Sequence, residues 1–201
     1  PPLALAPQEG ADILDMAAAP GGKTAQMAAM TGNRANITAC EINQIRAEKL
    51  KYNLEKQGAT RVNIMVRDAR KLEDFFRFDQ ILLDAPCSGS GTILLNEPAS
   101  YRAFSEKLVR NSAATQLALL KKALTILKRG GTMVYSTCSI LAQENEQAVA
   151  EALDGLPANK LHCSVLAEQA VKAAIQDYYD KNQIPYDPAD FAKPEEIQDG
   201  E

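Results

Sequence analysis

Two cysteines stand in motifs of small and polar residues, and each motif follows an apolar run that predicts a buried strand. Cys87 lies in LDAPCSG (residues 83–89), and Cys138 lies in YSTCS (residues 135–139). Ligands of an open α/β sheet bind at the carboxyl ends of its strands, so we expect both thiols at one crevice. A thiolate is a strong nucleophile that also leaves readily. The pattern predicts covalent catalysis in which one thiol attacks a substrate and the other assists its departure.

The other cysteines and the single histidine indicate neither a metal site nor a disulfide framework. Cys40 and Cys163 form no CxxC pair, and His162 is the only histidine. We expect no metal, a buried apolar role for Cys40 and Cys163, and a structural or exposed role for His162. General-base catalysis by histidine is therefore disfavoured.

Length and composition are those of one globular domain. The 201 residues are 46% hydrophobic and 24% charged, with a net charge of −4, which disfavours an autonomous, strongly basic nucleic-acid binder. No apolar run approaches the ~18 residues of a membrane span and no signal peptide is visible, so we expect a soluble, cytoplasmic protein without a membrane partner. Local basic clusters are read either as phosphate contacts or as solvated faces: Arg67, Arg70, Lys71, Lys121, Lys122, Lys128 and Arg129.

Apolar runs alternate with helical patterns over about the first 150 residues. Strands are predicted at 13–17, 36–41, 62–67, 78–84 and 132–137. Helices are predicted at 23–30, from Asn43 to Gly58, along a stripe of leucines (117, 120, 124 and 127) that stops at residues 130–131, and at 143–153. This alternation predicts an α/β, Rossmann-like fold, a mostly parallel sheet with helices on both faces. Tyr135 is expected in the core, and Ser139 and Glu144 are expected to cap and start the last helix.

The pattern weakens after Pro157, where a helix from about Val165 to Tyr179 and a proline-broken tail are expected. We therefore divide the chain into residues 1–155, the catalytic core, and residues 156–201, an extension or an incomplete end of the same domain. The start at Pro1-Pro2 is typical of an excised fragment.

The turn after the first strand, AAAPGGKT (residues 17–24), is made of small residues. A P-loop would need glycine at Ala17, and the GxGxxG pattern of dinucleotide binders is absent. What remains is a turn that lets a ligand approach the backbone and the amino end of the next helix.

Acidic residues follow at the ends of the next two strands. Glu41 is placed to accept hydrogen bonds from a ribose diol, and Asp68 to contact an adenine edge. Each acid alone is explained equally well as a capping or loop residue. As an ordered set with the small turn, they fit an adenosyl ligand without phosphates, namely S-adenosylmethionine.

Taken together, these motifs resemble the Sun/Fmu (Nop-type) RNA cytosine-5 methyltransferases. The resemblance extends over residues 3–150, and the combination of DAPCSG with STCS is highly specific. The shared features are residues 17–24, Glu41 with Arg46, residues 68–70, 84–91 and 130–131, STCS (136–139) and ENE (144–146).

The resemblance implies methylation of cytosine C5 in RNA through a covalent bond between cysteine and C6. It assigns the nucleophile to Cys138 and release of the methylated RNA to Cys87. It places contacts to S-adenosylmethionine at Ala17, Ala18, Ala19, Pro20, Gly21, Gly22, Lys23, Glu41, Arg46, Asp68 and Asp84.

The chemistry explains why such residues are needed. Cytosine C5 is a weak nucleophile until a thiolate adds to C6. We expect Lys23 and nearby backbone amides to lower the thiol pKa, and Asp84 to hydrogen-bond or protonate the N3/N4 edge of the base. With no histidine at hand, Cys87, Asp84 or a water is the expected base for the C5 proton.

We expect an RNA partner, ribosomal RNA before transfer RNA, and a monomeric enzyme. A non-catalytic RNA-binding or assembly module of the same fold is one alternative, although Lys23, the acids and both cysteines favour an enzyme. A methyltransferase for exocyclic amines is another, but it would favour a proline- and aromatic-rich turn where this chain carries Cys87.

Overall fold

The fold is taken from a computed structural model, which describes residues 1–94 and 96–154. Pro1–Asp154 form one compact unit. The expectations for His162, Cys163 and a helix at 165–179 lie outside the described residues, and the division of the chain near residue 155 stays a prediction. Among the described helices, none has both the length and the apolar content needed to cross a membrane.

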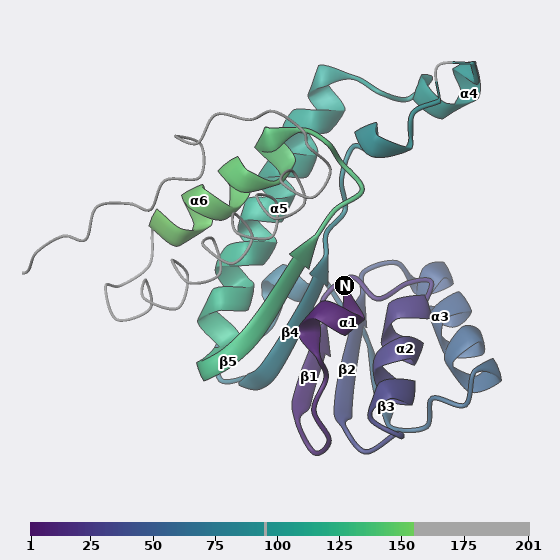
Figure 1. The fold of residues 1–201 in the computed structure, drawn as a ribbon, viewed down its shortest axis with the longest axis vertical. Coiled ribbons are helices and arrows are strands. Elements are labelled where there is room, and N and C mark those ends of the chain that lie inside the picture. Colours follow the sequence, from purple (N-terminus) through teal and green to yellow (C-terminus); the bar gives the residue numbers. More distant parts are fainter. Residues whose placement is uncertain (95, 155–201) are drawn as a thin grey trace, which may run out of the picture. The chain divides into compact units, whose positions relative to one another are not determined.

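A parallel five-stranded sheet forms the centre of this unit, in the order β3-β2-β1-β4-β5 (Figure 1). The strands are β1 (Asp12–Asp15), β2 (Asn36–Glu41), β3 (Val62–Val66), β4 (Phe78–Asp84) and β5 (Leu127–Ser136). The chain builds outward from β1 to β3 and then returns to place β4 on the other side of β1. This reversal is a topological switch point, beside which open α/β sheets bind ligands.

Helices cover both faces of the sheet (Figure 1). The α-helices are α1 (Pro2–Leu5), α2 (Gly22–Met30), α3 (Gln44–Lys56), α4 (Pro98–Tyr101), α5 (Glu106–Ile126) and α6 (Glu146–Asp154). In the described part of the chain, single 3₁₀ turns lie in the connections between elements: η1 (Ala69–Lys71) between β3 and β4, η2 (Ser90–Thr92) between β4 and α4, and η3 (Ala142–Glu144) between β5 and α6. The predicted α/β, Rossmann-like fold is thus confirmed.

Alternation along the central strands explains the two layers of helices. Ile13 is buried in a cluster with Leu5 of α1 and Met27 of α2, whereas the next residue, Leu14, is buried with Ala123 of α5 and Ala148 of α6. Successive strand residues point to opposite faces, so a strand buried on both faces must be apolar throughout. This requirement makes the strands visible as continuous apolar runs in the sequence.

The long helix ends earlier than predicted. α5 stops at Ile126. Leu127 already belongs to β5, where it pairs with Phe78 of β4. The leucine spacing is misleading because Leu127 still packs against the same core after the chain has left the helix. The buried stripe of α5 also includes two polar side chains, Ser112 and Gln116. The apolar members of the stripe are Val109, Leu119, Leu120, Ala123 and Ile126.

A bulge near the start of β5 sets its register against β4. Phe78 faces Leu127, but Gln80 faces Thr132, so the four residues 128–131 lie opposite Asp79. Gly130 has φ 77°, a conformation that favours glycine. A Cβ on Gly131 would lie 2.7 Å from the Asp79 carbonyl oxygen and 3.0 Å from that of Lys128. Gly130 is therefore required by its positive φ and Gly131 by a crowded backbone, and neither by a helix end.

We predict that Gly131→Ala lowers the free energy of unfolding by about 1–3 kcal/mol, because both clashing atoms belong to the backbone and cannot rotate away. Chemical denaturation measures the change. The matched control is Gly22→Ala, where a Cβ meets nothing within 4 Å, and which should stay within about 0.5 kcal/mol. Equal stability of the two variants would contradict the crowded bulge.

Candidate active site

The two cysteine motifs follow neighbouring strands and meet at the same end of the sheet. β4 and β5 pair in parallel with Asp84 opposite Ser136, so the loops after them start side by side. The Sγ atoms of Cys87 and Cys138 are 2.9 Å apart, and both thiols are free. Cys138 is exposed and Cys87 half-buried. The structure therefore brings together the two thiols that the sequence placed at one crevice.

The two loops also touch through their backbones. The Ala85 amide donates to the Ser136 carbonyl over 2.8 Å, and the Gly91 amide donates to the Cys138 carbonyl over 3.0 Å. A Cβ on Gly91 would lie 2.8 Å from that same carbonyl oxygen. Residue 91 must be glycine for the loop after β4 to approach Cys138 this closely.

A buried carboxylate joins the loops in a way that the sequence did not indicate. Glu144 is 0% exposed and accepts hydrogen bonds from the Ser88 amide, the Ser88 hydroxyl and the Ser139 hydroxyl. The expectation that Ser139 caps a helix begun by Glu144 was wrong. Glu144 ends η3, α6 begins at Glu146, and the side chains of Ser139 and Glu144 bond to each other instead.

Pro86, on the other side of Cys87, is held from α5. Gln116 is fully buried and its Nε2 donates to the Pro86 carbonyl over 2.9 Å. Sequence reasoning missed Gln116 as well. The available signal was its amide, a polar group within an otherwise mostly apolar helix stripe.

Lys23 and Asp84 form an ion pair beside the thiols. Lys23 Nζ lies 2.7 Å from Asp84 Oδ2, and the Ser136 hydroxyl donates to Asp84 Oδ1 over 2.8 Å. The expected net lowering of the thiol pKa is wrong, since the pKa of Cys138 rises to about 11. The hydrogen bond with Cys87 is the main cause, followed by burial and the charges of Cys87 and Asp84. A backbone hydrogen bond at Cys138 does lower this pKa, as expected of the nearby amides, but it is outweighed, and Lys23 is not among the groups that shift it.

Side chains of α3 hold the small-residue turn between β1 and α2. Gly21 has φ 108°, and a Cβ there would lie 2.9 Å from Leu50 of α3. Asn53 Nδ2 donates to the Pro20 carbonyl over 2.7 Å, and the Arg46 guanidinium donates to the Ala19 carbonyl over 3.1 Å. The turn is open at Gly22, which is exposed and has space where a Cβ would stand.

Asp15 anchors the same turn from the end of β1. It is buried, and the Thr24 hydroxyl donates to its carboxylate over 2.6 Å. Burial raises the pKa of Asp15 to about 6, although the hydrogen bonds from Thr24 and the Ala17 amide act in the opposite direction.

The predicted acids lie at the ends of β2 and β3. Glu41 is buried, accepts from the Asn43 amide over 2.9 Å and lies 3.4 Å from the Arg46 guanidinium. Asp68 accepts from the amide and guanidinium of Arg70, and this pairing lowers the pKa of Asp68 below its ordinary value. Arg46, expected at the cofactor, thus touches both Glu41 and the turn.

The basic clusters are largely engaged in ion pairs with neighbouring carboxylates, which favours the reading as solvated faces. The pairs are Arg67–Glu73, Arg70–Asp68, Lys122–Asp74 and Lys128 with both Asp12 and Asp79. Within residues 1–94 and 96–154, no group of three or more His, Cys, Asp or Glu side chains is arranged to hold a metal ion.

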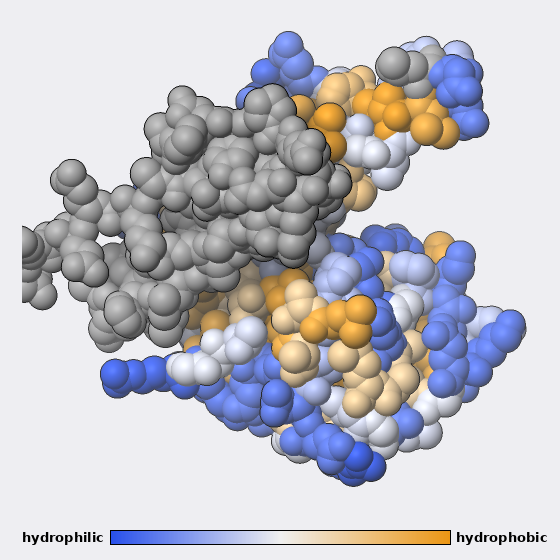
Figure 2. All heavy atoms as spheres, viewed as in Figure 1, coloured by the Kyte–Doolittle hydropathy of each residue, from blue (hydrophilic) through white to orange (hydrophobic). Residues whose placement is uncertain are grey.

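Apolar side chains are exposed on the segment that follows the Cys87 motif. Figure 2 shows apolar surface over the region of α4, where Leu94 is 49% and Phe104 39% exposed.

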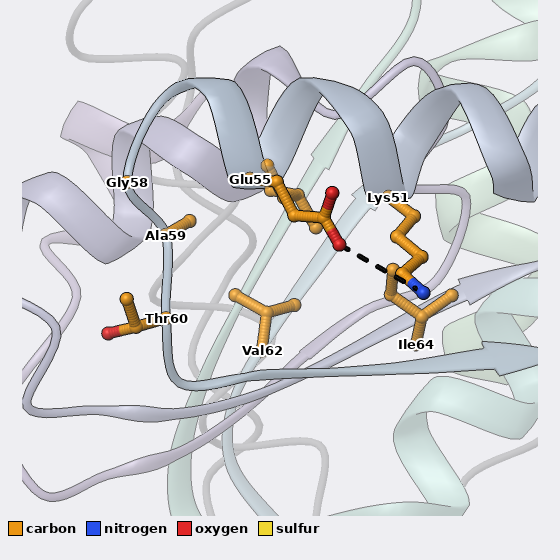
Figure 3. Close-up of a pocket in the computed structure, with 8 residues that line it drawn as sticks. Lys51, Glu55, Gly58, Ala59, Thr60, Val62 and Ile64 are labelled. Carbon is orange, nitrogen blue, oxygen red and sulfur yellow. Dashed lines mark ion pairs between the residues drawn. The ribbon is translucent and has the colours of Figure 1, made fainter.

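A separate groove lies between α3 and β3 (Figure 3), lined by Lys51, Leu54, Glu55, Gly58, Ala59, Thr60, Val62 and Ile64. It opens beside the amino end of β3, away from the strand ends that carry the thiols, and none of the predicted site residues lines it.

The sheet and its switch point define an α/β protein with the Rossmann-like fold of S-adenosylmethionine-dependent methyltransferases. The family described as 16S rRNA methyltransferase RsmB/F matches residues 2–190, and the chain belongs to this family.

Individual relatives agree with this assignment. The ribosomal RNA small subunit methyltransferase F of Vibrio cholerae serotype O1 (strain M66-2) is 42% identical over 137 residues, 67% of this chain and 29% of that protein. Among solved structures, NSun6 from Pyrococcus horikoshii with SFG is 37% identical, with a TM-score of 0.70 over 76% of this chain and 39% of that one. A methyltransferase homologue from the same organism is 38% identical, with a TM-score of 0.68 over 78% of this chain and 48% of that one. The chain spans about a third of the length of the curated relatives it matches.

The Asp15 carboxyl predicts a pH-dependent stability. Its folded-state pKa of about 6 lies above the ordinary 3.8, so its contribution is fully present below about pH 4 and is lost as the pH rises through about 6. The free energy of unfolding of Asp15→Asn should therefore rise relative to that of the unaltered protein, by about 3 kcal/mol between about pH 4 and pH 7. Urea denaturation across this range measures the difference.

Asp79 is the opposite case. Hydrogen bonds from the Asp12 amide and from Lys128 lower its pKa. Asp79→Asn should lose stability relative to the unaltered protein as the pH rises. A constant difference between Asp15→Asn and the unaltered protein at all pH values would contradict the raised pKa of Asp15.

From the thiol contact we predict that the pKa of Cys138 depends on Cys87. Cys87→Ala removes the main cause of the raised Cys138 pKa, so that pKa should fall from about 11 toward the ordinary 9.0. The pH dependence of iodoacetamide alkylation at Cys138, followed by mass spectrometry, measures it. Cys40→Ala, at the end of β2, is the control and should leave the profile of Cys138 unchanged. An unchanged profile in Cys87→Ala would show that the two thiols do not interact.

Proposed function

We propose that this chain forms the catalytic part of an S-adenosylmethionine-dependent RNA cytosine-5 methyltransferase that acts on ribosomal RNA. The observation that carries the proposal is the contact between the Cys87 and Cys138 thiols, 2.9 Å apart at the carboxyl ends of β4 and β5. The family description and the name of the Vibrio relative support ribosomal RNA as the substrate class. A monomeric, cytoplasmic enzyme is part of the same proposal and rests on the sequence alone.

The residues around the turn fit the proposed cofactor. Open space over Gly22 leaves the amino end of α2 accessible, and carboxylates stand at or just after the ends of three strands in Glu41, Asp68 and Asp84. The Pyrococcus NSun6 structure holds SFG, an analogue of S-adenosylmethionine. When bound, this cofactor would supply the methyl group. The turn residues 17–23 would hold its methionine end, and Glu41 and Asp68 its ribose and adenine.

The assigned residues account for the steps at the base. Cys138 Sγ bonds to cytosine C6, which makes C5 nucleophilic enough to accept a methyl group. Asp84, beside the thiols, hydrogen-bonds the N3/N4 edge while Lys23 balances its charge. After transfer, removal of the C5 proton lets the C5–C6 double bond re-form as the bond between C6 and Cys138 breaks. Cys87, in contact with Cys138, is placed to assist this release.

The decisive experiment measures methyl transfer to unmodified 16S ribosomal RNA by the full-length protein. Cys138→Ser should abolish transfer, because a serine hydroxyl is much harder to ionise than a thiol and is a far weaker nucleophile. Cys87→Ser should instead accumulate a protein–RNA adduct that survives denaturing electrophoresis. Cys40→Ala is the matched control, since its thiol is buried on β2, a strand that carries neither cysteine motif, and it should retain transfer.

Binding of S-adenosylhomocysteine, measured by calorimetry, should be retained in all three variants, which separates loss of chemistry from loss of the cofactor site. An adduct that persists in Cys138→Ser and is absent in Cys87→Ser would reverse the two roles. A folded protein that binds no cofactor and methylates neither ribosomal nor transfer RNA would favour the non-catalytic alternative.

A further inference from the structure

Glu144 connects the residues that directly follow each thiol in the sequence. Its Oε1 accepts from the Ser88 amide over 2.7 Å, next to Cys87, and its Oε2 accepts from the Ser139 hydroxyl over 2.6 Å, next to Cys138. The Ser88 hydroxyl donates to Oε2 as well. One carboxylate thus fixes two loops that lie far apart in the chain.

The surrounding hydrogen bonds run in a consistent direction toward this carboxylate. The Ile140 amide donates to the Ser90 hydroxyl, which lies 2.8 Å from the Ser139 hydroxyl. Ser139 also accepts from the Leu141 amide, so its own proton is directed to Glu144. All the remaining groups of this network donate a hydrogen toward Glu144, so the group at its end must accept only. A carboxylate is such a group.

Glu144 is itself held firmly in place. The Tyr135 hydroxyl donates to the Glu144 carbonyl over 2.7 Å. The neighbouring Asn145 contacts the Thr137 hydroxyl over 2.6 Å and donates to the carbonyls of Ser139 and Leu141. Both residues before and after Cys138 are therefore fixed by the segment that carries Glu144.

We propose that Glu144 is a positioning residue for the thiol pair, holding Cys87 and Cys138 at the separation that attack and release require. This inference rests on the proposed function. Addition to C6 needs the Cys138 sulfur at bonding distance from the plane of the base, and a misplacement of about 1 Å costs about 10²-fold in rate. Glu144 touches neither thiol, so its effect passes through Ser88 and Ser139.

The test substitutes glutamine, which keeps the size of Glu144 but directs an N–H₂ group at donors. Glu144→Gln in the full-length protein should lower kcat for methyl transfer by about 10- to 100-fold. The KM for S-adenosylmethionine should stay within about twofold, because the proposed cofactor residues lie on other elements. The control is Glu151→Gln, an exposed carboxylate of α6, which should leave both constants unchanged.

A second readout needs neither RNA nor activity. Diamide converts two neighbouring thiols into a disulfide while it is reduced to its hydrazine. Its rate of forming the peptide that links Cys87 to Cys138, measured by mass spectrometry, reports how closely the thiols are held. We expect this rate to fall at least about tenfold in Glu144→Gln, a loss comparable to that in kcat, and to stay unchanged in Glu151→Gln.

The outcomes separate the two proposals. If the unaltered protein methylates no RNA, the proposed function fails, yet the diamide rate still tests Glu144. Wild-type kcat and diamide rate in a folded Glu144→Gln would overturn the positioning role. If Glu144→Gln does not fold, Ser139→Ala, which removes one hydroxyl, should show a smaller loss in both measurements, and no loss there would likewise overturn it.

Discussion

The parallel pairing of β4 with β5 is the constraint on which the candidate site depends. Asp84 lies opposite Ser136, so the two motifs leave the sheet level with each other. A slip of one residue would turn every side chain of β5 to the opposite face and separate the thiols. The bulge opposite Asp79 sets this register from the far end of the strand. Gly130 and Gly131, distant from the chemistry, therefore help to decide where Cys138 stands.

Much of the fold could be predicted because strands buried on both faces must be apolar along their whole length. β2 and β4 were predicted at their observed bounds for this reason. Local chemistry was equally informative at Asn43, whose side chain accepts from the Arg46 amide and caps α3 as expected. The cysteine motifs were found because each directly follows such a strand, and strand ends meet at one edge.

The remaining features depend on contacts that sequence proximity does not reveal. Ser88 and Glu144 are 56 residues apart. Ser139 and Glu144, five residues apart, were interpreted as the start of a helix although a capping box needs a spacing of three. Lys23 was expected to act on a thiol, but its ammonium forms an ion pair with the carboxylate of Asp84, 2.7 Å away. The Cys138 pKa likewise depends on a partner 51 residues away. In each case the competing partner lies on a neighbouring strand end, and only the folded chain brings it close.

The thiol contact has an electrostatic consequence that bears on the proposed division of roles. Two sulfurs 2.9 Å apart cannot both carry a negative charge at low cost, because like charges at this distance oppose each other's ionisation. Lys23 is paired with Asp84, so this neighbouring ion pair adds little net charge. The arrangement thus disfavours two thiolates side by side. In the proposed order of steps this conflict does not arise, because the Cys138 sulfur is bonded to C6 and carries no charge when Cys87 assists release.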